Sequence, residues 1–477
     1  MLSSEKLHIL HTNDIHSHFQ QIPYITGGIR KLKKELQDRG ESVIAVDLGD
    51  HADRMSPITE GTWGQANVKV MNATGYQYAS IGNNEGLTFP KQKLLSLYEK
   101  ANFQVLCANV LDIETNAIPP FMKPYVIQQI GALRVCWISV TVAFPVYDLL
   151  GWKVLDPIST VQRIVSEVRE QADLVVLLSH TGFRNDQRLA QEVNGIDIII
   201  GAHTHELLET GVVVGDTFII QAGKFGQYLG QTTVEFDKHT KGIISITGIC
   251  HPVSSFPKAE DMAELIRQQE VSANQVLSPD IVTLDHDFHI SWEEESPLGN
   301  LLAEGIRDWV GSEIAMVNAG QLLFSLSKGS VTRKDLLTLC PHPINPCKLI
   351  IKGKFIRSIL EEALTEQSIH RQVRGLGFRG KVLGWMCVDG MTLHYDMNQA
   401  EGKRIQCILI QEKPLEEEKT YSLGTIDMFT FGWIFPLFKE AEKVDLFLPE
   451  FIRDVLAKEL KSRDALERSS KARWIHV

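Results

Sequence analysis

Residues 196–205 read Ile-Asp-Ile-Ile-Ile-Gly-Ala-His-Thr-His. The short run of isoleucines is typical of a buried β-strand, and two imidazoles, His203 and His205, follow it directly. In an open α/β sheet, the carboxyl ends of the strands face the crevice in which ligands bind. Because neutral imidazole is the commonest metal ligand in proteins, this stretch predicts a strand that delivers two candidate ligands to one crevice.

Four other segments repeat this arrangement, each with a metal-competent side chain just beyond an apolar run. The runs at residues 7–12, 42–48, 78–81 and 174–179 predict strands, which end in Asn-Asp-Ile-His, Gly-Asp, Gly-Asn and His, respectively. We expect the five strand ends to converge. Seven oxygen or nitrogen ligands are too many for one tetrahedral ion and enough for two ions that share a carboxylate. The strand ends supply seven such side chains, which are Asp14, His16, Asp50, Asn83, His180, His203 and His205.

Each of these residues has a simpler interpretation when it is taken alone. An isolated Asp14 or Asn83 is more often a helix cap or a turn residue, and an isolated strand-end histidine is more often just hydrogen-bonded. The joint placement of all seven favours a metal centre. His18 and His51 flank the predicted site without belonging to the ligand set.

The chain divides into two predicted α/β domains. From residue 7 to about 251, strand-like runs alternate with amphipathic segments, including predicted helices at residues 28–38 and 160–171. We expect a first domain over residues 1–256, a connecting helix over 257–277 and a second domain over 278–477.

Composition excludes several classes of protein. With a net charge of −11 over 477 residues, the surface should repel nucleic acid. The sequence has neither a signal-peptide pattern nor an apolar stretch long enough to span a membrane, so we expect a cytoplasmic protein without a membrane partner. The seven cysteines include no CxxC pair, and reduced, mostly buried thiols are expected.

The quoted motifs resemble those of the calcineurin-like metallophosphoesterases, and their order and intervals are similar to the 5′-nucleotidase branch. In the first half these are Thr-Asn-Asp-x-His at 12–16, Gly-Asp at 49–50, Gly-Asn-x-Glu at 82–85, Ser-His at 179–180 and Gly-x-His-Thr-His at 201–205. In the second half, residues 296–303, 318–320, 341–345 and 352–354 resemble the 5′-nucleotidase carboxyl-terminal domain.

The resemblance implies a four-layer α/β/β/α metal domain followed by a substrate-binding domain. It assigns Asp14, His16, Asp50 and His205 to one divalent ion, and Asp50, Asn83, His180 and His203 to the other. Asp50 would bridge two ions about 3.5 to 4 Å apart. Mixed oxygen and nitrogen ligands suit Mn²⁺, Zn²⁺ and iron alike. Phosphate esters would then be hydrolysed by in-line attack of a metal-bound hydroxide.

The sequence departs from the family pattern beside the metal ligands. The family motif usually reads Gly-Asn-His-Glu, with an aspartate two residues later, whereas this chain has Asn84 and Leu87 in place of the histidine and the aspartate. The amide of an asparagine donates hydrogen bonds but cannot act as an acid or carry a positive charge at neutral pH. Losing a general acid typically costs about 10² to 10⁴ in rate, unless His51 or His18 substitutes for it.

The second domain departs as well. The family arginine that follows the Asn-Gly-Gly motif is replaced by apolar residues after Gly320, but Arg374 and Arg379 lie in a glycine-rich segment that could seat phosphate. Phe429, Phe431 and Trp433 could stack a nucleobase. An exposed basic loop and core aromatic rings are the alternative interpretations.

We therefore expect a metallophosphoesterase that hydrolyses a small phosphorylated metabolite, such as a nucleotide or nucleotide sugar, with Asp50 and Asn84 beside the reacting phosphate. A phosphodiesterase or pyrophosphohydrolase on the same centre is one alternative. A metal-binding pseudoenzyme with a recognition role is another. The oligomeric state is left open by the sequence.

Overall fold

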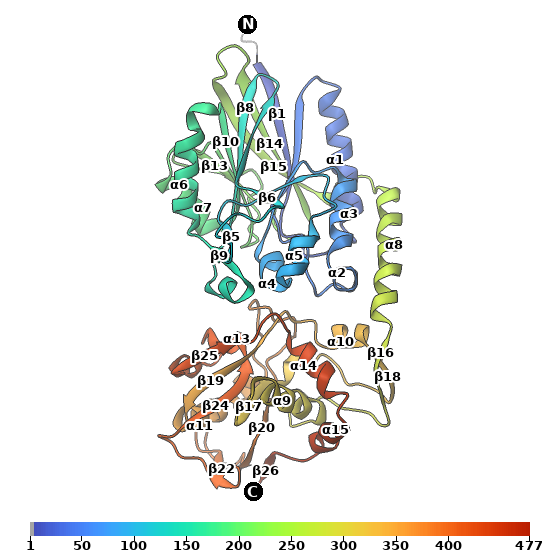
Figure 1. Ribbon diagram of the computed structural model, residues 1–477, viewed down its shortest axis with the longest axis vertical. Coiled ribbons are helices and arrows are strands. Elements are labelled where there is room, and N and C mark those ends of the chain that lie inside the picture. The colour runs from blue at the N-terminus through green and yellow to red at the C-terminus, as the bar shows by residue number, and fades with distance from the viewer. Residues whose placement is uncertain (1–3) are drawn as a thin grey trace. The chain divides into compact units, whose positions relative to one another are not determined.

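The computed structural model describes residues 4–477. The chain forms two compact units, unit 1 (Met1–Asn274) and unit 2 (Gln275–Val477), each with its own sheets and helices (Figure 1). Over residues 4–477, the helices lack the combination of length and apolar character that a membrane crossing requires.

Unit 1 is built on two large mixed sheets. In spatial order, the seven-stranded sheet contains β15 (Ile243–Pro252), β14 (Tyr228–Asp237), β1 (Ser4–Thr12), β2 (Ser42–Asp47), β3 (Tyr78–Ser80), β4 (Gln104–Leu106) and β6 (Met122–Lys123). The six-stranded sheet contains β12 (Val212–Val214), β13 (Thr217–Ile220), β11 (Ile198–Gly201), β10 (Leu174–His180), β8 (Leu133–Thr141) and β7 (Tyr125–Ile130). A small ribbon pairs β5 (Val110–Asp112) with β9 (Trp152–Val154).

The period-2 alternation of β8 shows how the layers form. Val135 and Trp137 pack between the two sheets, together with Leu7 and Ile9 of β1. The intervening residues of β8 point the other way, into a second apolar cluster with helix residues such as Ile164. Because side chains alternate across a strand, a continuous apolar run buries both faces of the sheet.

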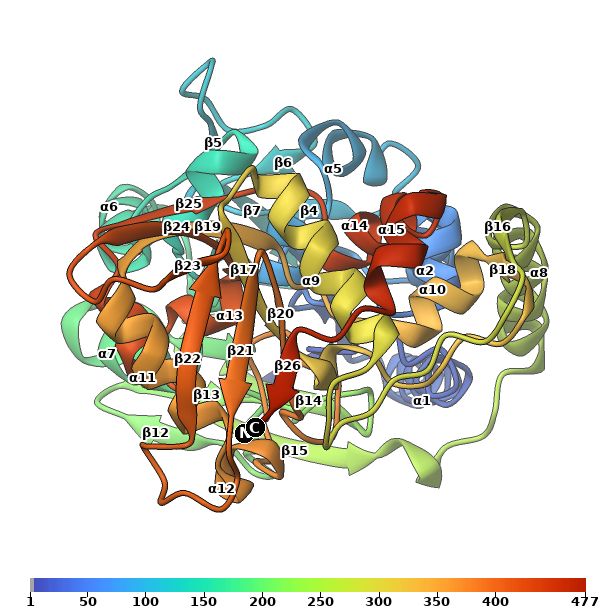
Figure 2. The same cartoon turned by 90° about the horizontal axis from the view of Figure 1, so that it is seen from below.

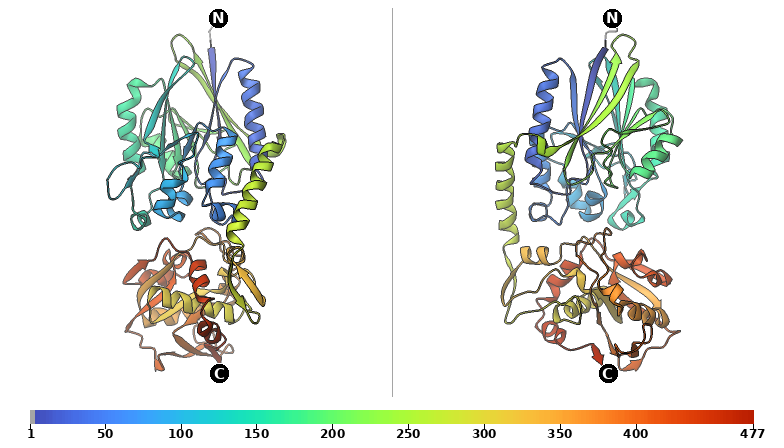
Figure 3. Two further views of the ribbon diagram at one scale, coloured as in Figure 1. Left: turned by 45° about the vertical axis from the view of Figure 1, so that its right-hand side comes forward. Right: turned by 180° about the vertical axis from the view of Figure 1, so that it is seen from behind.

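Helices cover the outer faces of the two sheets, which gives the four layers α/β/β/α (Figure 3). On the β10 side these are α6 (Pro157–Val168) and α7 (Phe183–Glu192), and on the β1 side α1 (Ile22–Gln37) and α3 (Gln65–Thr74). The remaining helical segments of unit 1 are α2 (Pro57–Thr62), α4 (Asn83–Thr88), α5 (Lys91–Leu97), η1 (Pro145–Leu150), η2 (Arg169–Gln171) and η3 (Val253–Ser255).

The expected helices are present with shifted ends. The helix predicted from residue 28 begins at Ile22, because Pro23 fits the first turn of a helix. The segment predicted as a connecting helix contains α8 (Glu260–Leu277). All seven cysteines are free, and six of them are buried.

Unit 2 holds a five-stranded sheet in the order β20 (Met386–Asp389), β17 (Ile314–Asn318), β24 (Thr420–Ile426), β19 (Pro346–Lys352) and β25 (Lys443–Leu446). A four-stranded sheet contains β23 (Lys413–Pro414), β22 (Ile405–Ile410), β21 (Met391–Tyr395) and β26 (Trp474–His476), and β16 (Asp280–Leu284) pairs with β18 (Gly329–Thr332) (Figure 2). The helical segments are α9 (Pro297–Val310), η4 (Ala319–Gln321), α10 (Arg333–Leu339), α11 (Gly353–Ala363), α12 (Glu366–Ile369), α13 (Asp427–Thr430), η5 (Pro436–Glu440), α14 (Ile452–Glu459) and α15 (Arg463–Ser469).

Strand directions bring several loops of unit 2 to one edge of the five-stranded sheet. Parallel strands β17 and β24 end at this edge, and β19 and β20 run antiparallel to them and begin there. The turn at residues 319–321, the segment 370–385 and the segment 427–435 therefore meet at the same edge.

Candidate metal centre

The seven predicted ligands converge in unit 1, although they come from five separate loops. Asp14 and His16 follow β1, Asp50 follows β2, and Asn83 opens α4 after β3. His180 ends β10, and the last two ligands, His203 and His205, follow β11. Parallel pairing of β1 with β2, β2 with β3, and β10 with β11 puts these loops at the carboxyl ends of their strands.

Five of the seven ligands have left-handed backbone conformations. The φ angles are +50° at Asp14, +45° at His16, +50° at Asp50, +79° at His203 and +65° at His205. A side chain other than glycine pays roughly 1 to 3 kcal/mol for such a conformation, and such residues cluster at active sites. The sharp turns are held by bonds between loops, for example from the His16 amide to the Asp50 carbonyl at 2.8 Å.

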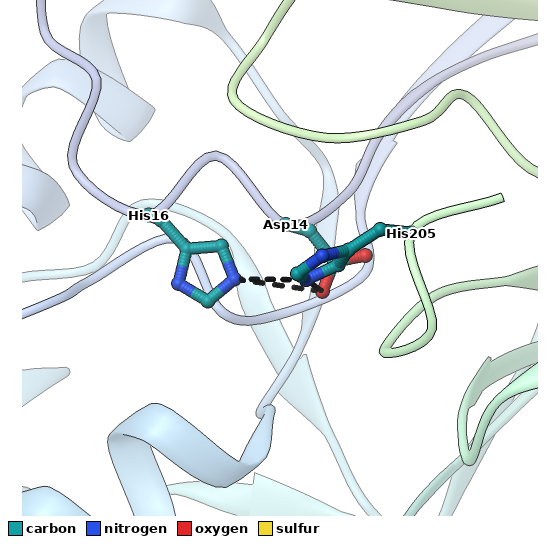
Figure 4. Close-up of side chains that lie close together, drawn as sticks. All are labelled: Asp14, His16 and His205. Carbon is teal, nitrogen blue, oxygen red and sulfur yellow. Dashed lines mark hydrogen bonds and ion pairs between the residues drawn. The ribbon is translucent and has the colours of Figure 1, made fainter. Parts of the chain in front are cut away.

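Asp14, His16 and His205 form one half of the centre, with their donor atoms turned toward one another (Figure 4). The Nε2 atoms of His16 and His205 are 3.2 Å apart. The Oδ1 atom of Asp14 lies 3.5 Å from Nε2 of His205. Oδ2 of Asp50 completes this half at 3.7 Å from Nε2 of His16.

Asn83, His180 and His203 form the other half. The Oδ1 atom of Asn83 lies 2.7 Å from Nδ1 of His203 and 3.3 Å from Nε2 of His180. Oδ1 of Asp50 lies 3.5 Å from the same His180 atom. Asp50 thus has one carboxylate oxygen toward each half, as the bridging role requires.

Opposite charges shape the protonation of this buried cluster. Burial by itself would raise the pKa of Asp50, but the imidazoles of His180 and His16 outweigh burial and hold the pKa well below its usual range. Burial would likewise lower the pKa of His180, but the carboxylates of Asp50 and Asp14 raise it to about 10. The centre therefore concentrates two carboxylates whose negative charge is offset by nearby positive charge.

A buried glutamate frames the bridging loop. Glu85 accepts hydrogen bonds from the backbone amides of Asp50 and Gly82 through Oε2, and from the amide of Ala52 through Oε1. Burial and the charge of Asp50 raise the pKa of Glu85 to about 7. A Cβ atom at Gly82 would lie 2.0 Å from Oδ1 of Asp50, so this position has room for glycine alone.

The donor set and its spacing fit two divalent cations. Nitrogen and oxygen ligands bind Zn²⁺ at about 2.0 to 2.2 Å, so two ligands of one ion stand about 3 to 3.5 Å apart. Within each half of the centre, the ligand atoms that face one another are 2.7 to 3.9 Å apart. Ring nitrogens of His16 and His205 that face each other are explained when both direct a lone pair at the same ion.

Unit 2 places the two predicted arginines in one loop. Arg374 is exposed, and the backbone amide of Arg379 donates to Nδ1 of the buried His342 at 2.8 Å. Nε2 of His342 contacts the carbonyl of Gln321 at 2.9 Å, and its ring stacks on Phe378. Loop 371–380 is thereby tied to the turn that follows β17.

The predicted aromatic residues separate into core and surface. Phe429 is fully buried and stacks on Phe438, so this ring belongs to the core and the expectation that it stacks a base is corrected. Phe431 is 47% exposed and lies 6.2 Å from the ring of Trp433, which is 67% exposed. Arg371 donates to the carbonyls of Trp433 and Ile434, and so ties this aromatic loop to loop 371–380.

Comparison with known proteins places the chain in a family. It is 38% identical over 456 residues to the uncharacterized metallophosphoesterase YunD of Bacillus subtilis, an alignment that covers 95% of this chain and 98% of the relative. The chain belongs to the calcineurin-like metallophosphoesterases of the 5′-nucleotidase type. Residues 7–207 match the calcineurin-like phosphoesterase model, and residues 280–440 match the 5′-nucleotidase C-terminal domain.

Two further similarities extend over both units. A snake venom 5′-nucleotidase of Gloydius brevicauda is 27% identical over 493 residues, covering 88% of this chain and 80% of the relative. The crystal structure of a putative 5′-nucleotidase from Staphylococcus aureus shares the fold, with a TM-score of 0.70, 18% identity and coverage of 99% and 100%. This metallophosphoesterase is therefore a hydrolase of phosphoric ester bonds.

Asn84, where the metallophosphoesterase family usually has histidine, is buried against the centre. Its Nδ2 donates to Oδ2 of Asp50 at 2.6 Å, and its backbone amide donates to Oδ1 of the same carboxylate at 2.7 Å. Asn84 thus holds the carboxylate of Asp50 in place. His51 is buried, and its Nδ1 atom lies 3.2 Å from Nδ2 of Asn67. Burial lowers the pKa of His51 to about 3, so this side chain is a poor proton donor at neutral pH.

Sequence reasoning missed two residues of this metallophosphoesterase centre. Oδ2 of Asp53 lies 3.2 Å from Nδ1 of His16. The spacing of Asp50 and Asp53 after β2 is the feature of the sequence that could have indicated it. Phe225 stacks on His18 at 4.1 Å and touches the edge of His16. Its amide donates to the Asp14 carbonyl from a loop 211 positions away, so no local pattern announces it.

Proposed function

We propose that this protein hydrolyses a small phosphorylated metabolite, a nucleotide or a nucleotide sugar, with a pair of divalent ions. The observation that carries the proposal is the convergence of the seven ligands in two halves that share Asp50. When bound, two such ions supply an activated water nucleophile and the positive charge that clamps phosphate oxygens. Mn²⁺, Zn²⁺ and iron suit this ligand set.

The chain's own residues bind, orient and limit access. The side chain of His205 is 30% exposed, and Asn83 and His203 are also partly exposed, whereas Asp14, His16, Asp50 and His180 are buried. A phosphate therefore reaches the centre from the side of Asn83, His203 and His205. Asn84 holds the carboxylate of Asp50 by two hydrogen bonds. Hydrolysis by direct attack of water requires no covalent intermediate on the protein.

A pyrophosphohydrolase activity is the second candidate, and Asn84 is the observation that favours it. The amide at this position cannot transfer a proton to the departing oxygen. An alkoxide needs that proton far more than a phosphate leaving group does, because phosphate is already a stable anion near neutral pH. We therefore expect phosphoanhydrides to be cleaved in preference to alkyl phosphate monoesters.

We assign recognition of the base to Phe431 and Trp433 in unit 2. Both rings are exposed, and base stacking on an aromatic side chain is worth about 1 to 3 kcal/mol. Arg374 and Arg379, in the loop tied to them through Arg371, are candidates for a phosphate group. The net charge of −11 supports small phosphorylated substrates over nucleic acid, and the free cysteines support a reducing, cytoplasmic location.

The decisive experiment is hydrolysis by the metal-loaded protein. Purified protein with Mn²⁺, Zn²⁺ or Co²⁺ is assayed on nucleoside monophosphates, nucleotide sugars, p-nitrophenyl phosphate and bis-p-nitrophenyl phosphate, beside Asp50→Asn. We expect turnover that Asp50→Asn reduces by at least about 10³-fold, since it removes the charge shared by both ions. Equal rates for the two proteins would falsify the proposal.

A second assay separates base recognition from chemistry. Trp433→Ala should raise KM for a nucleotide by about 5-fold or more, with little change in KM for p-nitrophenyl phosphate, which has no base. Leu149→Ala, at another exposed apolar side chain, is the matched control. An identical KM for nucleotides in wild type and Trp433→Ala would remove the aromatic pair from the substrate site.

A further inference from the structure

The ring of His16 has a different neighbour at each nitrogen. Its Nε2 faces the metal centre, 3.2 Å from Nε2 of His205 and 3.7 Å from Oδ2 of Asp50. Its Nδ1 faces away, 3.2 Å from Oδ2 of Asp53. A neutral imidazole binds a cation with one nitrogen while the other carries the proton, so the partner of the outer nitrogen selects the tautomer.

Asp53 is held firmly in this position. Its side chain is 1% exposed, and its backbone amide donates to Oγ of Ser17 at 2.8 Å. Its second carboxylate oxygen, Oδ1, accepts a hydrogen bond from the amide of Met55 at 3.0 Å. The oxygen that faces His16 is therefore fixed by the loop that also carries Asp50.

Asn84 cannot serve as the outer partner of His16. Its Nδ2 lies 3.4 Å from Nδ1 of His16, but this amide nitrogen is a donor and already contacts Oδ2 of Asp50 at 2.6 Å. The proton on Nδ1 of His16 thus goes to Asp53. The outer nitrogen of the ligand His180 has a different kind of partner, because its Nδ1 lies 2.8 Å from the backbone carbonyl of Leu48.

We propose that Asp53 is a positioning residue for the metal centre. By accepting the Nδ1 proton, its carboxylate keeps the Nε2 lone pair of His16 turned toward the ion that His16 shares with Asp14, Asp50 and His205. A carboxylate that accepts the Nδ1 proton also makes the imidazole a stronger metal ligand than a carbonyl acceptor in the same place would. This inference rests on the proposed dinuclear centre and adds a residue outside its seven ligands.

Titration with Mn²⁺ tests the inference without any substrate. Calorimetry on metal-free wild type, Asp53→Ala and Asp53→Asn gives the affinity of each equivalent, and melting in EDTA reports folding. Asp186→Asn is the matched control, because Asp186 is equally buried in unit 1 and bonds Ser179 and Gln221 instead of a ligand. Mn²⁺ electron paramagnetic resonance separates spin-coupled pairs from single ions.

We expect Asp53→Ala to weaken one of the two equivalents by about 10- to 100-fold and to leave the other within about twofold of wild type. Its resonance spectrum should change from coupled pairs to single ions. Asp53→Asn, which keeps an oxygen acceptor, should show a smaller loss. The control should keep both affinities, whatever its melting temperature in EDTA.

Two results overturn the inference. Wild-type affinities for both equivalents in Asp53→Ala and Asp53→Asn would show that His16 needs no carboxylate partner. Equal weakening of both equivalents, with the same result in Asp186→Asn, would show a general structural effect. A wild-type protein that takes up fewer than two equivalents would overturn the proposed function first, and this inference with it.

Discussion

His16 and His205 direct their Nε2 atoms at each other across 3.2 Å, although 189 positions separate them in the chain. His203, only two residues before His205, instead contacts Asn83 in the other half of the centre. The His-x-His pair after β11 therefore reaches both halves. Left-handed backbone at both histidines directs the two side chains to different neighbours.

This division predicts that the two histidines are needed for different ions. After dialysis against dilute Mn²⁺, His203→Ala and His205→Ala should each retain about one equivalent, because each variant loses a ligand of one ion only. Asp50→Asn should lose most of both. Metal content by mass spectrometry measures this, and a full loss in either histidine variant would argue against two separable halves.

Gly82→Ala should damage the centre while the fold survives. The backbone of Gly82 is ordinary for any residue, with φ at −97°, but the new methyl group would meet Oδ1 of Asp50 at 2.0 Å. We expect the bridging carboxylate to move, with loss of metal binding and of activity by more than about 10²-fold. Gly242→Ala, whose methyl would meet nothing closer than 3.4 Å, is the control. Full metal binding by Gly82→Ala would contradict the close contact.

Asn84→His should restore a proton donor beside the reacting phosphate. Turnover of alkyl phosphates should rise, by up to about 10²-fold, while substrates with good leaving groups gain little. A series of esters with leaving groups of graded pKa measures this as a shallower dependence of rate on leaving-group pKa. Asn84→Gln, which adds bulk but no proton, controls for size. An unchanged dependence would mean that another group already protonates the leaving oxygen.

His342 should make stability depend on pH. Burial lowers its pKa to about 3, whereas an unfolded chain has a histidine pKa of about 6.5. Between these values the unfolded chain binds a proton that the folded chain does not, so the free energy of unfolding falls as pH drops below 6.5. His342→Gln should make this decline shallower, by up to about 1.4 kcal/mol per pH unit.

Urea unfolding at pH 7, 6 and 5 measures the slope for wild type and His342→Gln. His286→Gln, at a histidine of unit 2 that is 58% exposed, is the control and should keep the wild-type slope. Parallel pH dependence in wild type and His342→Gln would show that this buried ring does not set the effect.

The sequence predicted the ligand set because the rule that connects it to space is local. Each of the seven side chains lies within a few residues of the carboxyl end of an apolar strand, and the carboxyl ends of parallel strands share one edge. The positions of His180, the last residue of β10, and of Asp50, three residues after the end of β2, needed no long-range information. The boundaries of α1 and α8 were less well predicted, because helix ends depend on packing as well as on pattern.

Local patterns could not rank the aromatic residues of unit 2. Phe429 and Phe431 lie two positions apart in the sequence, yet Phe429 is fully buried against Phe438 and Phe431 is 47% exposed. Exposure is decided by which segments pack over a ring, and these come from elsewhere in the chain.

The local sequence predicted the convergence of seven candidate ligands, since strand ends and residue types are written locally, and its resemblance to a known family supplied the four-layer fold and the missing histidine at Asn84. The surroundings of those seven side chains came from the folded structure alone. Asp53 behind His16, Phe225 against His18 and Glu85 beneath Asp50 are contacts between different loops. The physical reason is that a side chain's tautomer, charge and exposure depend on neighbours brought together by folding, which no local pattern specifies.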